Sequence, residues 1–478
     1  MLFHSFEFPL FLALAFAGYW FVFSRKLWLQ NLFVVVASYV FYGWWDWRFL
    51  LLMSFTSLWS FASGLLVSKI DGFKGRPAAW KGRVLVSLAL VVNLGILGFF
   101  KYFDFFVGSA VDFLALFGLE TQGVALRIIL PVGISFYTFQ ALGYVIDVYR
   151  GMRPTRDIVA FLAFISFFPQ LVAGPIERAS NLLPQFLAPR RFDYGDAVSG
   201  CRQMLWGFFK KVVVADNCAR YADSLLGNPG SGGLAILTGI FLFSIQIYGD
   251  FSGYSDIAIG CAKLFGVKLR RNFNIPYFSR DIAEFWRRWH ISLNTWFRDY
   301  LYIPLGGSRC GKLKRVRNTF AVFLVSGLWH GANWTFVLWG FVHALCFLPL
   351  LLTNRNRRHV DNEWRFSQIP SIVATFALVV FAWTFFRAPD ITTAFSWLGS
   401  IFTFAPGEIS NKLASKAFRH SLPWIVALFT VEWINRNKDF ECALWPKNTV
   451  VRWTLYVLLV WTIILMRGAN QSFIYFQF

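Results

Sequence analysis

Long apolar runs constrain this chain more than any other feature of its sequence. Residues 84–100, 232–249, 334–352 and 370–386 contain no Asp, Glu, Lys or Arg, and each approaches or reaches the roughly 20 residues that an α-helix needs to cross a bilayer. Lipid offers backbone polar groups no hydrogen-bond partner, so runs that span a membrane must be helical. Similar runs occupy residues 8–24, 31–45, 48–68, 128–146, 158–174, 421–435 and 450–466. We therefore predict an all-α, polytopic membrane protein with about a dozen hydrophobic segments.

The charge of the chain is concentrated between these runs. Only 15% of the 478 residues are charged, 57% are apolar, and the formal net charge is +21. The stretches 69–83 and 309–317 each carry five Lys or Arg, and 263–271 and 355–365 are also basic. Such clusters in short loops are typical of the cytoplasmic side of a membrane protein. We therefore expect all four stretches in the cytoplasm, and no nucleic-acid partner.

One stretch breaks the apolar pattern, because residues 268–317 are dense in arginine and aromatic side chains. A charged side chain facing lipid costs about 2.5–3.5 kcal/mol even on the lenient insertion scale. The stretch must therefore lie along the interface or be buried against other helices. Its charged residues between 280 and 299 are Arg280, Asp281, Glu284, Arg287, Arg288, Arg298 and Asp299.

A second irregularity separates the apolar pieces 319–329 and 334–352, which are joined by the residues His330 to Asn333. Both flanking basic stretches are expected in the cytoplasm, so an even number of passes is required and we predict a broken hairpin. His330 lies twelve residues after Asn318, a rise of roughly 18 Å into a layer about 30 Å thick. Irregular backbone at that depth is tolerated around a cavity.

Among the six histidines, His330 and His290 come from these two unusual stretches. Burial keeps an imidazole neutral and able to accept a proton, which suits a general base that activates a hydroxyl. The alternative is a hydrogen-bonded histidine at a helix break. His343 lies inside an apolar run, where we expect packing with one polar contact.

The segment 246–256 places Asp250 and Tyr254 four residues apart, on one face of a helix. They could orient a histidine or line a polar passage, or they could only satisfy neighbouring backbone or arginine groups. The chain has no metal-ligand spacing, no phosphate-binding glycine loop and no GxSxG sequence.

Several ordered motifs resemble the membrane-bound O-acyltransferases, and most closely their alginate O-acetyltransferase branch. The three main blocks are QIYGDFSGYSDIAIGCAKLFG (246–266), the stretch 272–307 that contains RRWHISL, and VSGLWHGANWTFVLWG (325–340). Residues 37–50, 131–151 and 168–178 add to the resemblance, which covers most of residues 1–345. It implies one membrane domain over 1–478 with a motif-bearing core at about 131–345, built as a ring of tilted helices around a central tunnel.

The resemblance also implies roles for individual residues. The essential histidine of the family, in its LWHG context, falls on His330, and its second histidine falls on His290. With His330 as the base, Asn333 or a protonated His290 is our candidate to stabilise an oxyanion. Trp329, Asp250 and Tyr254 are candidate tunnel residues.

The resemblance further implies a cellular setting. We expect acetyl-CoA as the acyl donor from the cytoplasm, no permanently bound cofactor, and a location in the bacterial inner membrane in contact with lipid. Expected partners are a periplasmic acetyltransferase of the SGNH hydrolase type and polysaccharide-export machinery. The acetylated polymer could be alginate, cellulose or peptidoglycan. Two alternatives stay open, namely D-alanyl transfer to teichoic acids and a transporter with buried histidines along its path.

Overall fold

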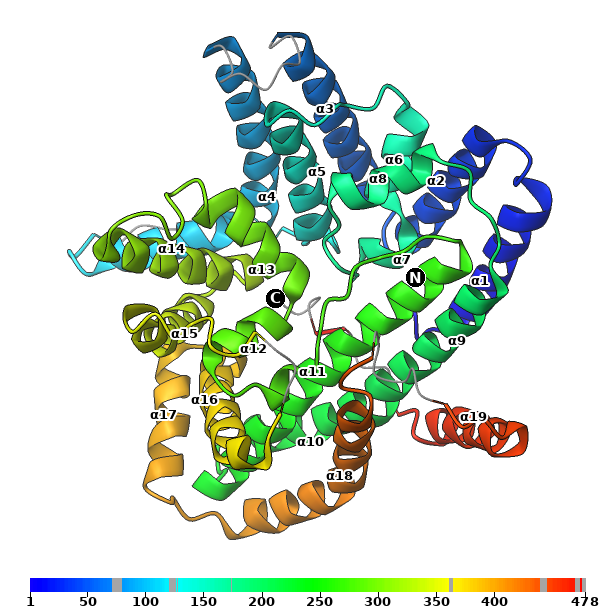
Figure 1. The fold of residues 1–478 in the computed structure, drawn as a ribbon. Helices are drawn as coiled ribbons and strands as arrows, with labels where there is room; N and C mark the ends of the chain where they lie inside the picture. The colour runs from blue at the N-terminus through cyan, green and yellow to red at the C-terminus, as the bar shows by residue number, and fades with distance from the viewer. Residues whose placement is uncertain are drawn as a thin grey trace. The chain divides into compact units, whose positions relative to one another are not determined.

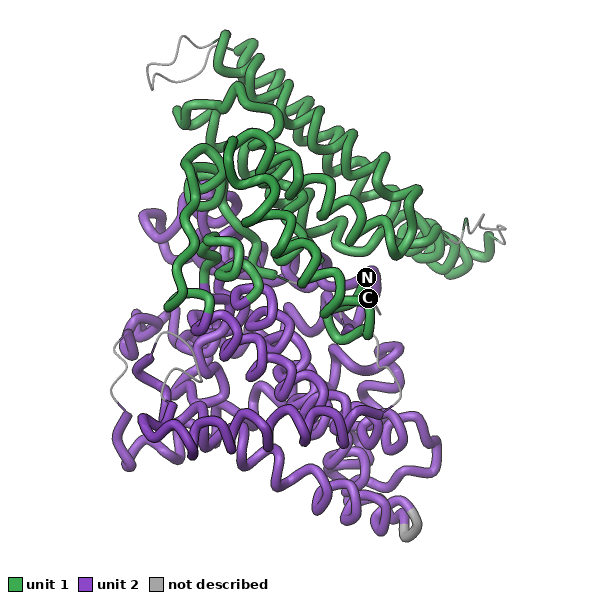
Figure 2. The backbone as a smooth tube through the Cα atoms, turned by 90° about the vertical axis from the view of Figure 1, so that its right-hand side faces the viewer, with its two compact units in different colours: residues 1–197, 261–270 green, residues 198–260, 271–478 purple. Residues whose placement is uncertain are grey.

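The computed structural model describes residues 1–70, 80–119, 126, 128–172, 174–360, 364–438, 445–468 and 473–474. Over these ranges the chain forms helices and no strand, which confirms the all-α prediction (Figure 1). Most of the basic stretch 69–83 and part of 355–365 lie outside the described residues. The chain divides into two compact units, residues 1–197 with 261–270, and residues 198–260 with 271–478 (Figure 2).

The first unit is a helical assembly whose buried polar side chains bind backbone carbonyls of segments distant in the chain. Asn31 donates to the carbonyl of Phe186 at 2.8 Å, and Tyr42 donates to that of Val132 at 2.8 Å. Its helices are α1 (Glu7–Ala17), a π-helical turn (Gly18–Val22), α2 (Leu27–Gly43), α3 (Arg48–Ile70), α4 (Trp80–Ala115), α5 (Ile134–Tyr149), α6 (Ile158–Ser166), α7 (Phe168–Leu171) and α8 (Ala179–Leu187). The apolar run 158–174 is therefore broken into two short helices rather than forming one.

The second unit contains all the candidate site residues. Its helices are α9 (Tyr194–Phe208), the π-helix Phe209–Ala215, α10 (Asp216–Leu226), α11 (Gly233–Leu264), α12 (Ile282–Arg288), α13 (Ile291–Phe297), α14 (Lys312–His330), α15 (Trp334–Leu352), α16 (Ile369–Arg387), α17 (Ile391–Phe402), α18 (Glu408–Ile434) and α19 (Thr449–Leu465), with short helical turns at 276–278, 298–302 and 366–368. The first residues of α9 and the last of α11 belong to the first unit.

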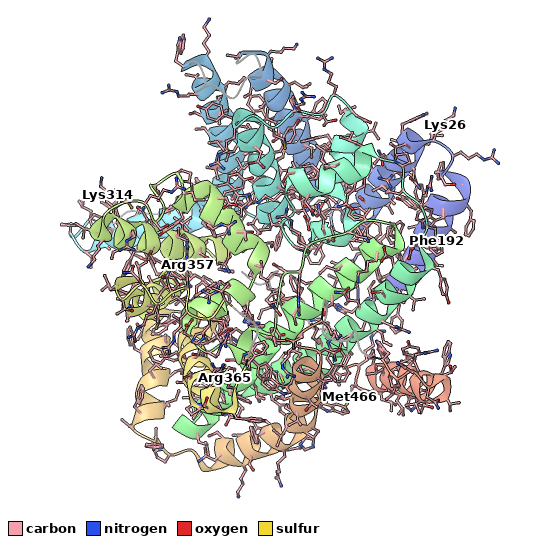
Figure 3. All side chains as sticks on the ribbon, in the orientation of Figure 1. Lys26, Phe192, Lys314, Arg357, Arg365 and Met466 are labelled. Carbon is pink, nitrogen blue, oxygen red and sulfur yellow. The ribbon has the colours of Figure 1, made fainter. Side chains whose placement is uncertain are left out.

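Helices α14 and α15 form the hairpin that the basic flanks predict. Their backbones approach closely at Gly327 and Gly340, where an added Cβ would lie 2.2 Å from the carbonyl oxygen of Phe336 and 2.3 Å from that of Phe323. Small residues at a crossing are typical of packed membrane helices. At the open end, Arg315 of the first basic stretch donates to the side chain of Asn354, the residue before the second, at 3.1 Å. Lys314 and Arg357 of the two stretches are labelled in Figure 3.

Five helices are long and apolar enough to cross a membrane, namely α3, α4, α11, α15 and the segment Phe366–Arg387. Four shorter apolar helices accompany them in the described ranges. The prediction that the apolar segments are helical is thus confirmed, but the predicted number of about a dozen is not. Helix α19 buries none of its residues, and large apolar side chains such as Val457 and Trp461 are exposed along it. Surfaces of this kind face lipid or a partner protein.

Candidate active site

His330 is the last residue of α14 and lies at the break in the hairpin. The break is built locally, because a Cβ at Gly331 would collide with the Phe336 ring at 2.1 Å. Asn333 then caps α15 by accepting from the Thr335 N–H at 2.9 Å. The His330 imidazole is buried, and its ring centre lies 5.0 Å from Trp329, 5.1 Å from Trp339 and 5.5 Å from Phe386.

His290 lies between two short helices, α12 and α13. It adopts a left-handed backbone conformation, with φ 44° and ψ 54°, and its side chain is buried. The neighbouring rings are Phe251 on α11 at 4.7 Å and Trp329 at 5.7 Å. His290 lies outside the five helices that could span a membrane, and burial lowers its pKa from 6.5 to about 3. The ring is therefore neutral at physiological pH.

The structure brings these two histidines together although forty positions separate them in the chain. Their ring centres are 6.3 Å apart, and Trp329 contacts both rings. At this separation both imidazoles can reach the same acyl group. Two imidazoles beside one acyl carbonyl can supply a base for an attacking hydroxyl and a donor for the developing oxyanion.

Asn333 is engaged in the local structure of the break. Its amide nitrogen donates to the carbonyl of Pro389 at 2.8 Å, while its oxygen caps α15. The residue therefore supports the turn that carries His330. Both polar groups of Asn333 are thus engaged. The other oxyanion donor that the sequence suggests, a protonated His290, does not fit the lowered pKa, and a neutral His290 would donate its ring N–H instead.

Asp250 belongs to a buried ion cluster, which comprises Lys210 and Lys211 of the π-helix, Asp216 of α10, and Asp250 and Asp256 of α11. Lys211 lies 2.8 Å from the carboxylates of both Asp250 and Asp216, and Lys210 pairs with Asp256. The Tyr254 ring packs 5.6 Å from the Lys211 ammonium and 4.3 Å from the Phe473 ring. Asp250 also accepts the Ile474 N–H at 2.8 Å. The Asp250 carboxylate thus pairs with a cation and a backbone N–H. This is closer to the second alternative that the sequence leaves open, in which Asp250 only satisfies neighbouring groups.

His343 packs in an aromatic cage. Its ring centre lies 4.8 Å from Trp339 and 4.9 Å from Trp286, and Phe285 stacks on it at 6.2 Å. Within the described ranges neither ring nitrogen has a hydrogen-bond partner, so the expected polar contact is not found there.

Three charged side chains of the stretch that precedes His290 are buried, whereas Arg287 is exposed. Glu284 binds Arg280 at 3.0 Å and Arg288 at 2.8 Å, and all three side chains are buried. Burial by itself would raise the pKa of Glu284, but the two arginines outweigh that effect and the pKa lies below its usual value. Arg280 and Arg288 also lie over the ring of Trp364. The network anchors α12, and with it the segment that leads to His290.

Sequence reasoning missed the contribution of the C-terminal third. Phe386 of α16 lies beside His330, and Trp383 packs 5.6 Å from Trp339 and 5.2 Å from Trp289. It also missed Lys210 and Lys211, although adjacent lysines in an amphipathic stretch opposite two aspartates were a usable signal. Aromatic residues in an apolar run give no such signal, because the same pattern is exposed elsewhere, as at Trp453 and Trp461 of α19.

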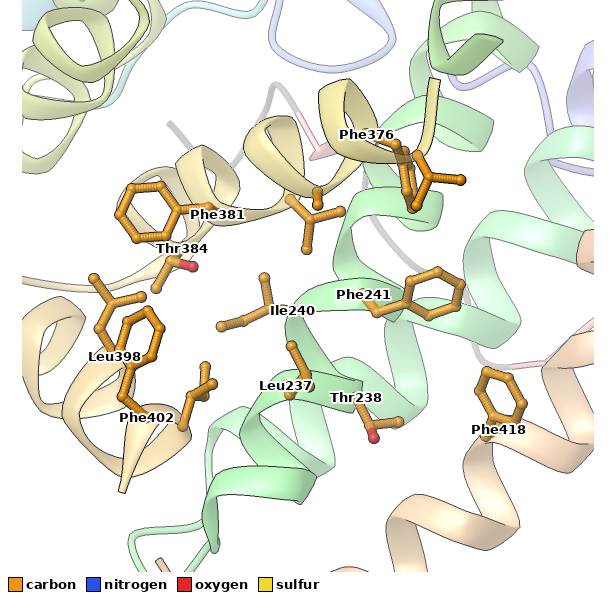
Figure 4. A pocket seen from close by; sticks show the side chains of 14 residues that line it. Leu237, Thr238, Ile240, Phe241, Phe376, Phe381, Thr384, Leu398, Phe402 and Phe418 are labelled. Atoms are coloured by element: carbon orange, nitrogen blue, oxygen red, sulfur yellow. The ribbon is translucent and has the colours of Figure 1, made fainter. Parts of the chain in front are cut away.

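A separate apolar pocket of about 510 Å³ lies among α11, α16, α17 and α18 (Figure 4). Its lining is formed by aliphatic and aromatic side chains with two threonines, Thr238 and Thr384. The lining contains no acid, base or nucleophile suited to acyl transfer, and neither His290 nor His330 belongs to it.

Comparison with known proteins identifies similar sequences. A profile of MBOAT, the membrane-bound O-acyltransferase family, matches residues 153–388, a range that contains both histidines. The chain is 38% identical over 476 residues to the "Probable alginate O-acetylase AlgI" of Pseudomonas putida, covering 94% of each protein. It is 42% identical to the protein of the same name from Pseudomonas aeruginosa, covering 80% of this chain and 71% of that one. It is also 36% identical to the "Peptidoglycan O-acetyltransferase" of Helicobacter pylori, covering 80% and 76%.

Proposed function

The chain belongs to the membrane-bound O-acyltransferase family, and on this premise we propose that it O-acetylates an exported polysaccharide of the alginate type. Family membership makes it an O-acyltransferase rather than a transporter. The relatives described above are named as acetylases or acetyltransferases, which favours acetyl over D-alanyl transfer. Cellulose and peptidoglycan are the alternative polymers.

One observation carries the catalytic part of the proposal, namely the buried His290 and His330 rings whose centres are 6.3 Å apart. In the proposed reaction, His330 takes the proton of an acceptor hydroxyl while the hydroxyl oxygen forms a bond to the acetyl carbonyl carbon. The carbonyl oxygen becomes an oxyanion, which the ring N–H of neutral His290 stabilises. The carbon–sulfur bond of the thioester then breaks, and the leaving thiolate takes the proton from His330.

We further propose how the enzyme is placed in the cell. It spans the inner membrane several times, as one domain that forms a ring of about a dozen spanning and re-entrant helices around a tunnel. Acetyl-CoA delivers the acetyl group from the cytoplasm, and an SGNH-type periplasmic partner passes it to polymer that the export machinery delivers. The basic stretches at the open end of the α14–α15 hairpin, opposite His330, support this orientation.

The proposal is tested by deleting the gene in a strain that exports the polymer and complementing it with this chain. We expect ester-linked acetate on the polymer to disappear and return, with no change in the yield of polymer. Ester-linked D-alanine that follows the gene in place of acetate would refute acetyl transfer. Purified protein in detergent, supplied with the polymer or the periplasmic partner as acceptor, should release free thiol from acetyl-CoA, and no release above the protein-free rate would refute the proposed donor.

A further inference from the structure

The backbone at His290 is strained. Its φ of 44° lies in the left-handed region, which residues with a side chain adopt only where the surrounding structure over-determines it. The preceding Trp289 is extended, with φ −96° and ψ 130°. The turn between α12 and α13 therefore consists of two residues, and the second of them carries the candidate catalytic imidazole. A relaxed turn would point that imidazole elsewhere.

Backbone hydrogen bonds hold one side of this turn. The N–H of Ile291 donates to the carbonyl of Asn272 at 2.9 Å, and the N–H of Asn274 donates to that of Arg288 at 2.9 Å. The side-chain oxygen of Asn272 accepts from both the N–H and the hydroxyl of Ser292, at 3.2 and 2.9 Å. These contacts fix the chain just before and just after His290.

On the other side of the turn, the side chain of Asn294 binds two backbone carbonyls. Its amide nitrogen donates to the carbonyl of Trp286 at 2.6 Å and to that of Trp289 at 2.5 Å. The first carbonyl belongs to the last turn of α12 and the second to the residue that follows it, where a helix leaves its last acceptors without intrahelical donors. The backbone N–H of Asn294 also donates to the carbonyl of His290 at 3.1 Å. Asn294 therefore forms hydrogen bonds to the chain before His290 and to His290 itself.

We propose that Asn294 is a positioning residue, whose side-chain amide holds the left-handed turn and so directs the His290 imidazole toward His330. The expected effect of Asn294 on the reaction rate rests on the proposed acyl transfer, whereas its expected effect on the backbone conformation at His290 does not. Asn294 acts through backbone carbonyls and is not required to contact the substrate. Its loss should therefore slow the chemical step while leaving the binding of the acyl donor unchanged.

The test replaces Asn294 with leucine, which has a similar shape but no donor. The matched control is Asn217→Leu, because Asn217 is also half-buried and donates its amide to two helix carbonyls, those of Val212 and Val213. We expect Asn294→Leu to lower kcat for thiol release from acetyl-CoA at least tenfold with KM within twofold. Asn217→Leu should leave both constants within twofold. Unchanged kcat in Asn294→Leu overturns the proposal, as does an equal loss in the control.

A second measurement does not depend on activity. Glycine adopts positive φ freely, so His290→Gly should unfold at a higher temperature than His290→Ala. In the Asn294→Leu background this difference should shrink, because the turn is no longer held in the left-handed conformation. An unchanged difference overturns the proposal even if the wild-type protein proves inactive with acetyl-CoA, which separates its failure from that of the proposed function. If Asn294→Leu does not reach the membrane, Asn294→Ser keeps one donor and should show an intermediate kcat, and full activity there overturns the proposal.

Discussion

At the scale of single residues, His330 and His343 lie in the same hairpin and are buried to the same degree, with 2% and 1% of their surface exposed. A purely structural account expects similar damage from replacing either one. The catalytic account does not, because removing a general base costs about 10²–10⁴ in rate. His330→Ala should reach the membrane at normal levels and leave the polymer unacetylated, whereas His343→Ala should keep most of the acetylation.

The measurement is ester-linked acetate on the polymer, normalised to the amount of this protein in the membrane fraction. The proposed mechanism fails at its centre if His330→Ala retains substantial acetylation, or if acetylation disappears only because the protein does.

The depressed pKa of His290 makes a second residue-scale prediction, about stability and pH. The folded pKa is about 3 and the ordinary value is 6.5, so the unfolded chain binds a proton in that interval that the folded chain does not. Stability is therefore complete above about pH 6.5 and falls as the pH drops toward 3. From pH 6.5 to 5.0 one such group accounts for about 2 kcal/mol.

His290→Asn removes the titration while keeping a residue type that tolerates the left-handed conformation. Thermal unfolding of the purified proteins between pH 5.0 and 7.5 should show that stability decreases less toward acid pH in the variant than in the wild type. Parallel pH profiles would show that His290 does not carry this dependence.

At the scale of elements, the α14–α15 crossing depends on glycine. A methyl group at Gly340 would lie 2.3 Å from the Phe323 carbonyl, whereas at Gly399 on α17 no atom lies within 4 Å. Gly340→Ala should therefore separate the two helices, destabilise the protein by about 1–3 kcal/mol and lower acetylation through displacement of His330. Gly399→Ala should be neutral or slightly stabilising.

The comparison is made by thermal unfolding and by polymer acetylation for both variants side by side. Equal behaviour of the two alanine variants would mean that the hairpin adjusts to the added methyl group and that close contact does not set the position of His330.

At the scale of the whole molecule, the topology can be checked directly. Reporter fusions at Lys314 and Arg357 should both report the cytoplasm, because both residues belong to basic stretches that lie at one end of the same hairpin. A fusion at Lys74 should do the same, although that position lies outside the described residues. A periplasmic signal at Lys314 would contradict the arrangement that places His330 within the membrane.

The sequence by itself determined the class of this protein and the short list of its reactive groups. Apolar runs of membrane length must be helical because lipid cannot satisfy backbone polar groups. A histidine such as His330, in an apolar setting beside a helix break, is noticed because buried ionisable groups are costly. The motifs around it identified the family.

Only the tertiary structure decided how these groups meet. The pairing of His290 with His330, the left-handed turn held by Asn294, and the ion pair that joins Lys211 to Asp250 all link separate helices or depend on one backbone angle. Periodicity along a chain reports which face of a helix is apolar, but not which other helix that face meets. The aromatic residues of α16 beside His330 illustrate this limit, because in the sequence they are identical in kind to aromatic residues that are exposed elsewhere.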